Sequence, residues 1–210
     1  MIRILIADDH AILRRGLKEI LVRELQDVVC GEAEDAQQVL AQMRNCEWDL
    51  VMLDITMPGR SGLDVLKDLK SMCPKLPVLV LSMHPEEQYG KRVLKAGAWG
   101  YMSKKSAPEE LIKAIRKLLA GGQYVSPALA EKLAWDLKRD ATRLAHEILS
   151  DREFEILRMI ASGKTVTQIA GDLHLGVSTV STHRARILEK MHMTTTAELM
   201  RFAISNHLVD

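Results

Sequence analysis

The first 120 residues alternate short apolar runs with amphipathic stretches, a pattern that predicts strands separated by helices. Five runs have the length of buried strands, the second with the weakest pattern: 2–7, 27–33, 49–53, 77–82 and 99–103. The clearest helix follows the last run, where apolar residues recur at helical spacing between Pro108 and the Gly121–Gly122 pair. Strands that alternate with helices imply right-handed crossovers, so we expect a doubly wound, five-stranded parallel sheet.

From residue 149 onward the pattern is helical. Three Ser or Thr residues are followed three positions later by Glu or Gln, which is the capping-box spacing of a helix start: Ser150–Glu153, Thr165–Gln168 and Thr195–Glu198. A fourth helix is expected to start at Ser178, after the short Gly-containing turn HLGV at 174–177. The sequence therefore predicts a small all-α domain of four helices with a helix-turn-helix.

The length of 210 residues suits two modest domains better than one. We predict a first domain at 1–121, an extension helix with a linker at 122–147, and the all-α domain at 148–210. Ser126 and Pro127 can cap and begin the extension helix, and fewer large apolar residues follow them.

Composition narrows the class of protein. With 47% hydrophobic and 27% charged residues, the chain should be soluble and able to bury real cores. A formal net charge of +1 means that any binding to nucleic acid must come from a local basic surface. The three cysteines, Cys30, Cys46 and Cys73, lack zinc-ligand spacing and are interpreted as reduced thiols. With neither a signal peptide nor a membrane-spanning run in the sequence, we expect a cytoplasmic protein with no membrane partner.

Polar residues gather where the predicted strands end: Asp8, Asp9, Asp54, Ser82 and Lys104. The carboxyl ends of parallel strands meet at one edge, and in the flavodoxin-like order 2-1-3-4-5 the first and third strands are neighbours. Three carboxylates would then converge within a few ångströms, where they raise one another's pKa unless a cation neutralises them. Carboxylate oxygens suit Mg²⁺ better than Zn²⁺, so a Mg²⁺ site is expected.

The chemistry open to this edge is limited. No Gly-rich phosphate loop follows the first strand, and no Ser/His pair has nucleophile-elbow spacing, which argues against a nucleotide site and against acyl transfer. A carboxylate can itself attack phosphorus and form an aspartyl phosphate. Mg²⁺ would bridge the carboxylate and the phosphoryl oxygens, while Lys104 offers a charge and Ser82 a hydroxyl.

Asp8–Asp9, Asp54 followed by ITMPGRSG, Ser82 and GYMSKK together resemble the receiver domain of bacterial two-component response regulators. The resemblance implies that Asp54 is the phosphoacceptor. It also implies that Asp9, Asp54 and the Thr56 carbonyl bind Mg²⁺ directly, that Asp8 acts largely through water, and that Ser82 and Tyr101 form a switch pair. Lys105 stands where many receivers carry proline, often with a cis peptide, so the geometry at Lys104–Lys105 stays open.

On the helix after HLGV, short hydroxyls and Arg side chains fall largely off the apolar stripe, which suits contacts to phosphates and base edges. Residues 149–191 resemble the LuxR-type helix-turn-helix, and its pairing with a receiver is the NarL/FixJ arrangement. The resemblance implies a motif at Val166–Ala185 whose last helix enters the major groove. The candidate DNA contacts are Ser178, Thr179, Ser181, Thr182, Arg184, Arg186 and Lys190. Relatives often have lysine at Ser181, and His183 is interpreted as packed or capping rather than as a metal ligand.

The leading hypothesis is a phosphorylation-dependent, DNA-binding transcription regulator that is not an enzyme beyond its own phosphoryl transfer and slow dephosphorylation. Its expected partners are a sensor histidine kinase, double-stranded DNA, a second copy of the chain when phosphorylated, and RNA polymerase. One alternative is a hydrolase that passes through the same aspartyl phosphate, although Thr56 stands where such enzymes usually carry a second acid. Another is a regulator whose DNA binding does not depend on phosphorylation.

Overall fold

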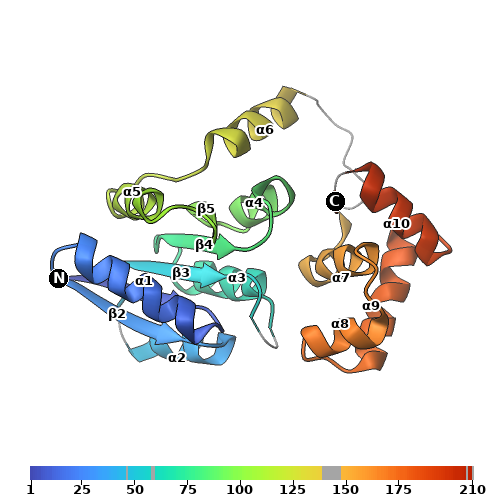
Figure 1. The fold of residues 1–210 in the computed structure, drawn as a ribbon, viewed down its shortest axis with the longest axis horizontal. Helices are drawn as coiled ribbons and strands as arrows, with labels where there is room; N and C mark the ends of the chain where they lie inside the picture. Colours follow the sequence, from blue (N-terminus) through green and yellow to red (C-terminus); the bar gives the residue numbers. More distant parts are fainter. Residues whose placement is uncertain (46, 58–59, 139–147, 207, 210) are drawn as a thin grey trace. The chain divides into compact units, whose positions relative to one another are not determined.

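The computed structural model describes residues 1–45, 47–57, 60–138, 148–206 and 208–209 (Figure 1). The chain divides into two compact units, Met1–Arg139 and Asp140–Asp210, and each is considered by itself. The predicted linker at 122–147 includes residues 139–147, which fall outside the described residues. Within the described ranges, none of the helices is both long and apolar enough to cross a membrane.

The first unit is built on a five-stranded parallel sheet in the order β2-β1-β3-β4-β5. Its strands are β1 (Ile2–Ala7), β2 (Val28–Ala33), β3 (Leu50–Asp54), β4 (Val78–Ser82) and β5 (Gly100–Ser103). The predicted fold class and strand order are confirmed. Asp54 is the last residue of β3 rather than the first residue after it, and it pairs with Leu81 of β4.

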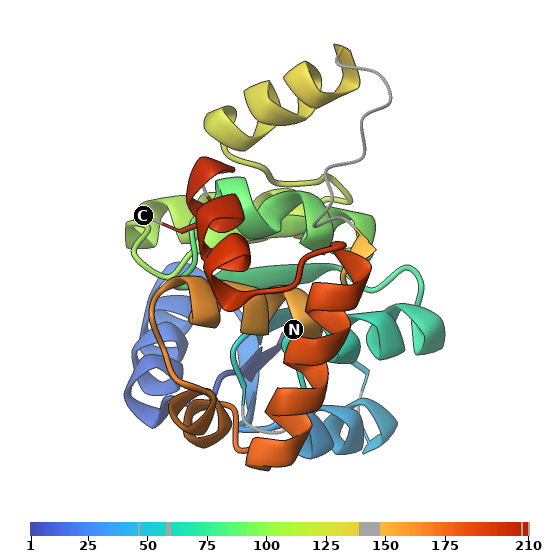
Figure 2. The same cartoon turned by 90° about the vertical axis from the view of Figure 1, so that its right-hand side faces the viewer.

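Helices cover both faces of this sheet, as Figure 2 shows, with α1 on one side and α2 and α3 on the other. The helices are α1 (Ala11–Glu24), α2 (Ala36–Asn45), α3 (Gly62–Met72), α4 (Glu86–Lys95) and α5 (Pro108–Leu119). Alternate residues of β1 point to opposite faces, so Ile4 and Ile6 join Leu17, Leu21 and Ile115 in the core under α1 and α5. This packing holds the carboxyl ends of all five strands at one edge.

The extension helix is α6 (Pro127–Lys138), and it begins at the residue that the sequence predicts. The segment before α6 lies along the edge strand β5. There the Tyr124 N–H donates to the Trp99 carbonyl at 2.9 Å. Leu129 is buried and packs where Gly90 of α4 has no side chain; a Cβ at Gly90 would come within 2.6 Å of it. The described part of the extension therefore packs on α4.

The second unit contains α7 (Asp151–Ala161), α8 (Val166–Asp172), α9 (Val177–Lys190) and α10 (Thr196–Ser205). Capping boxes are present at Ser150, Thr165 and Thr195, as predicted. The predicted start of α9 at Ser178 is wrong: Gly176, in an extended conformation, is the N-cap and no side chain caps the helix. Glycine is acceptable there because it readily adopts the extended cap conformation. With Gly176 as the cap, the helix begins at Val177, one residue before Ser178.

The core of the second unit is formed by the apolar stripes that the sequence indicates. Phe154, Leu157, Ile169, Val180, Ile187 and Leu199 are all at most 1% exposed. In the turn between α8 and α9 the left-handed residue is His174 (φ 53°), whereas Gly176 has a negative φ. The turn therefore owes its shape to His174, and Gly176 serves as the cap of α9.

Candidate functional site

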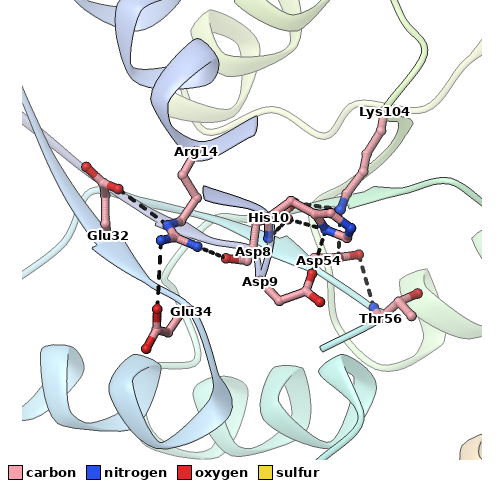
Figure 3. A network of polar contacts seen from close by, with 9 residues as sticks. All are labelled: Asp8, Asp9, His10, Arg14, Glu32, Glu34, Asp54, Thr56 and Lys104. Carbon is pink, nitrogen blue, oxygen red and sulfur yellow. Dashed lines mark hydrogen bonds and ion pairs between the residues drawn. The ribbon is translucent and has the colours of Figure 1, made fainter. Parts of the chain in front are cut away.

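Two carboxylates and one lysine meet at the carboxyl edge of the sheet (Figure 3). Lys104 Nζ lies 2.6 Å from Asp8 Oδ2 and 2.7 Å from Asp54 Oδ2. The Asp8 and Asp54 residues are 1% and 2% exposed, and the Lys104 side chain is 5% exposed. The strand order brings together residues that are 46 to 96 positions apart in sequence, as expected from the sequence. The result is a buried cluster of two acids and one base.

Asp54 is held from two sides. Its Oδ1 accepts a hydrogen bond from the Thr56 N–H at 3.0 Å, while its Oδ2 pairs with Lys104. Burial raises the pKa of Asp54 from 3.8 to about 6, against the opposing effects of Lys104 and the Thr56 N–H. Burial also lowers the pKa of Lys104, but Asp54 and Asp8 outweigh it and raise that pKa overall. Lys104 is therefore charged, and added positive charge would favour the ionised form of Asp54.

The same edge of the sheet also holds a group of side chains that could bind a divalent cation. Asp8, Asp9, His10 and Asp54 each offer one ligand atom, and these atoms lie within 4.8 Å of one another. Three of the four donors are carboxylate oxygens, which fit the predicted Mg²⁺. The fourth, His10, was not predicted as a site residue. The one feature of the sequence that could indicate this role is the position of His10 directly after Asp8–Asp9, in the loop that follows β1.

The predicted switch residues Ser82 and Tyr101 are joined through the backbone of a third residue. Both are 0% exposed. Ser82 Oγ accepts from the His84 N–H at 3.0 Å, and the Tyr101 hydroxyl donates to the His84 carbonyl at 2.8 Å. The His84 ring also stacks on Tyr89 of α4, with ring centroids 4.8 Å apart. Sequence reasoning missed His84, because its role comes from a loop backbone that no side-chain pattern reveals.

Arg14 of α1 links the acidic loop to Glu32 and Glu34, as Figure 3 shows. Its Nη1 donates to the Asp8 carbonyl at 2.7 Å, and its Nε donates to Glu32 of β2 at 3.3 Å. The side chain is 11% exposed. Sequence reasoning also missed this residue, since an arginine on a helix usually indicates only a solvated face.

The loop after β5 follows an ordinary course. The Lys104–Lys105 peptide bond is trans, so the chain does not adopt the cis geometry that occurs in many receivers. Lys105 is exposed, and its N–H donates to Ser103 Oγ at 3.2 Å. The Lys104 N–H donates to the Ser82 carbonyl at 2.8 Å, which fixes the base of the lysine beside β4.

The predicted DNA-contact residues of α9 differ in how free their side chains are. The exposed members are Ser178, Thr179, Ser181, Thr182, Arg186 and Lys190. Arg184 is half-buried and its Nε donates to Thr196 Oγ1 at 3.1 Å, while Lys190 pairs with the buried Glu153 at 2.7 Å. The side chains of Arg184 and Lys190 thus already contact other residues of the second unit.

His183 lies on the inner side of the same helix. It is half-buried, and burial lowers the pKa of its ring. Among the residues that the structure describes, it belongs to no group of potential metal ligands. Its position is that of a packed residue of α9.

Comparison with known proteins covers both units. The family described as the response regulator receiver domain matches residues 4–116, and the family described as bacterial regulatory proteins of the luxR family matches residues 147–203. Response regulator GacA of Pseudomonas aeruginosa is 36% identical over 213 residues, which cover 100% of this chain and 99% of GacA. Response regulator UvrY of Escherichia coli is 32% identical, over 99% of this chain and 96% of UvrY.

Solved structures of RcsB from Salmonella resemble the whole chain. RcsB bound to promoter rprA in the presence of the phosphomimetic BeF3⁻ has a TM-score of 0.65 and 28% identity, over 98% of this chain and 100% of that one. A further RcsB structure, described in terms of conformational dynamism for DNA interaction, has a TM-score of 0.68 and 27% identity, with 97% of each chain covered.

Proposed function

This chain belongs to the NarL/FixJ family of response regulators, and we propose that phosphorylation of Asp54 controls its binding to DNA. The phosphodonor is a partner histidine kinase, and the output is transcription regulation through the helix-turn-helix unit. The single observation that carries the proposal is the buried Asp54 carboxylate. Its Oδ2 is paired with Lys104, and its Oδ1 is fixed by the Thr56 N–H.

The buried carboxylate is suited to phosphoryl transfer. An ionised Asp54 oxygen attacks phosphorus, a new O–P bond forms, and the bond from phosphorus to the donor group breaks. Lys104 is charged and within reach of Asp54, so it can balance negative charge on the transferred group. Asp8, Asp9 and Asp54, with the Thr56 carbonyl, would hold Mg²⁺, which when bound supplies further positive charge to the phosphoryl oxygens.

Ser82 and Tyr101 would pass the change on to α4. Ser82 Oγ now accepts from the His84 N–H, and its hydroxyl can instead turn toward a phosphoryl oxygen on Asp54. Loss of that hydrogen bond removes one of the contacts that position His84, the residue whose carbonyl accepts from Tyr101. Because the His84 ring stacks on Tyr89 and Leu129 of α6 packs against Gly90, the shift reaches the extension helix. Phosphorylation then changes the population of an existing second conformation.

The output surface is the exposed side of α9, which begins inside the motif Val166–Ala185 and continues beyond it to Lys190. Ser181, Thr182 and Arg186 are exposed there and carry the hydroxyl and guanidinium groups that bind phosphates and base edges. A phosphorylated homodimer would place two such helices on half-sites about one helical turn apart. RNA polymerase is a further partner in this proposal. The proposed location of the protein is the cytoplasm, where it can bind the bacterial chromosome.

Phosphorylation with a small donor tests the proposal. The full chain is incubated with acetyl phosphate and Mg²⁺, and the intact mass is measured. The wild type and the control Asp64→Asn, which changes an exposed acid of α3, should each gain one phosphoryl group. Asp54→Asn should gain none, and equal labelling of Asp54→Asn would remove Asp54 from the mechanism.

The same preparation separates the alternative functions. Rapid multiple turnover of a small phosphate ester would identify a hydrolase rather than a regulator. DNA binding that is equally tight with and without acetyl phosphate would identify a regulator independent of phosphorylation. Either result would contradict the proposal.

A further inference from the structure

His10 brings an imidazole into the acidic cluster, where the family resemblance assigns only oxygen ligands. It follows Asp8 and Asp9 in the loop between β1 and α1, and its ring lies among the carboxylates (Figure 3). Its Nδ1 is 2.7 Å from Asp9 Oδ1 and 3.1 Å from Asp8 Oδ1. The ring nitrogen Nδ1 is therefore directed at the two acids that begin the site.

The backbone holds the main chain of His10 beside Asp8. The His10 N–H donates to Asp8 Oδ1 at 2.9 Å, so the residue is tied to the buried carboxylate by its main chain and its ring together. Asp8 is itself fixed by Lys104 on its other oxygen. The His10 side chain is 68% exposed, which leaves its ring free to rotate as an ion enters.

The distances allow the nitrogen to share one ion with the oxygens. The ligand atoms of Asp8, Asp9, His10 and Asp54 lie within 4.8 Å of one another. Two donors at about 2.1 Å from a common first-row ion are at most about 4.2 Å apart, so the atoms need to move by less than about 1 Å. The exposed side chains of Asp9 and His10 can move by that amount while Asp8 and Asp54 stay buried.

We propose that His10 is a metal ligand that makes this a mixed nitrogen–oxygen site, selective for divalent cations that favour imidazole. Co²⁺, Ni²⁺ and Zn²⁺ accept imidazole nitrogen readily, whereas Mg²⁺ prefers oxygen and keeps much of its water. The site then binds Co²⁺ or Ni²⁺ more tightly, relative to Mg²⁺, than its carboxylates would do alone. This inference rests on the proposed function, because it requires the same acidic site to bind a cation.

The test compares two ions on the untagged full chain. Titration calorimetry with Co²⁺ and with Mg²⁺ is run on the wild type, His10→Asn and His192→Asn, and the visible absorption of bound Co²⁺ is recorded. His192 is an exposed histidine of the second unit, so its replacement controls for binding by surface imidazoles. His10→Asn should lose at least about 10-fold in Co²⁺ affinity and change the Co²⁺ spectrum, a loss in the range known for changes around metal ligands. Its Mg²⁺ affinity should fall by clearly less than its Co²⁺ affinity, and His192→Asn should match the wild type for both ions.

The other outcomes decide against the inference in distinguishable ways. Equal Co²⁺ affinity and spectrum in the wild type and His10→Asn would show that the imidazole is not a ligand. A parallel loss of Co²⁺ and Mg²⁺ in His10→Asn would show a disturbed loop and no selectivity. If Asp54→Asn binds both ions as well as the wild type, the acidic site holds no cation, and the proposed function fails together with the inference.

Discussion

The carboxyl edge of the sheet and the outer face of α9 differ in how far their charged side chains are buried. At the sheet edge, Asp8, Asp54 and Lys104 are almost fully buried, and Lys104 Nζ lies 2.6 Å from Asp8 and 2.7 Å from Asp54. On α9, Arg186 is exposed, and Lys190 reaches back to Glu153 with 41% of its side chain still exposed. Charges interact strongly where water is excluded and weakly on a wet surface. Changes at the edge should therefore alter the stability of the fold, whereas changes on α9 should mainly alter DNA binding.

Removal of Lys104 should give the largest effect. Lys104→Gln leaves Asp8 and Asp54 buried without their cation, and a broken buried pair costs about 3–5 kcal/mol. Urea denaturation of the full chain in EDTA, followed by a probe of the first unit, should show this loss in unfolding free energy. Added Mg²⁺ should restore part of the lost stability, because it supplies the missing positive charge.

Lys105→Gln is the matched control, since Lys105 is the next residue and is exposed. It should change the unfolding free energy by less than about 0.5 kcal/mol. If Lys104→Gln and Lys105→Gln have the same unfolding free energy, the ion pairs of Lys104 do not stabilise the sheet edge. The contrast between buried charges at the edge and exposed charges on α9 would then be wrong.

Neutralising Asp54 should have a smaller effect of the opposite sign. Its folded pKa of about 6 exceeds its ordinary 3.8, so ionised Asp54 opposes folding. That cost is absent below the ordinary pKa, grows as the pH rises between the two values and is complete above about 6. In EDTA at pH 8, Asp54→Asn should gain up to about 3 kcal/mol in unfolding free energy. The gain should shrink steadily as the pH is lowered toward 4.

The exposed Asp64→Asn serves again as the control and should show no such pH-dependent gain. A gain of equal size at all pH values would mean that burial of the Asp54 charge is not its cause.

On α9 the expected effects appear in binding rather than in folding. Arg186→Ala removes an exposed guanidinium and should reduce the slope of log affinity against log salt by about 1, the value for one lost phosphate contact. Arg184→Ala should change that slope less, because Arg184 Nε is bonded to Thr196. DNA-binding titrations between low and moderate salt measure both slopes, and equal slopes in the wild type and Arg186→Ala would show that Arg186 contacts no phosphate.

The same contrast explains what could be predicted from sequence. Asp8, Asp54, Ser82 and Lys104 could be placed at one edge because each stands at the end of an apolar run, and parallel strands end together. Three helix starts could also be predicted, because a capping box is a local pattern of two side chains. Features set by strand order or by local spacing are thus accessible from one sequence.

Features set by packing were not accessible. The bridge from Ser82 to Tyr101 runs through the His84 backbone, and the Lys190–Glu153 pair joins residues 37 positions apart on different helices. The start of α9 was misplaced because a Gly N-cap carries no side-chain signal. His10 was missed because the sequence does not show that a ring beside two acids turns toward them.

Control of DNA binding by Asp54 can be measured on the whole genome at once. Genomic DNA fragments are selected on the purified full chain, with and without acetyl phosphate and Mg²⁺, for the wild type and Asp54→Asn. Acetyl phosphate should enrich specific fragments on the wild type and should have no such effect on Asp54→Asn. Enrichment of the same fragments by both proteins, with or without acetyl phosphate, would contradict the claim that Asp54 controls DNA binding.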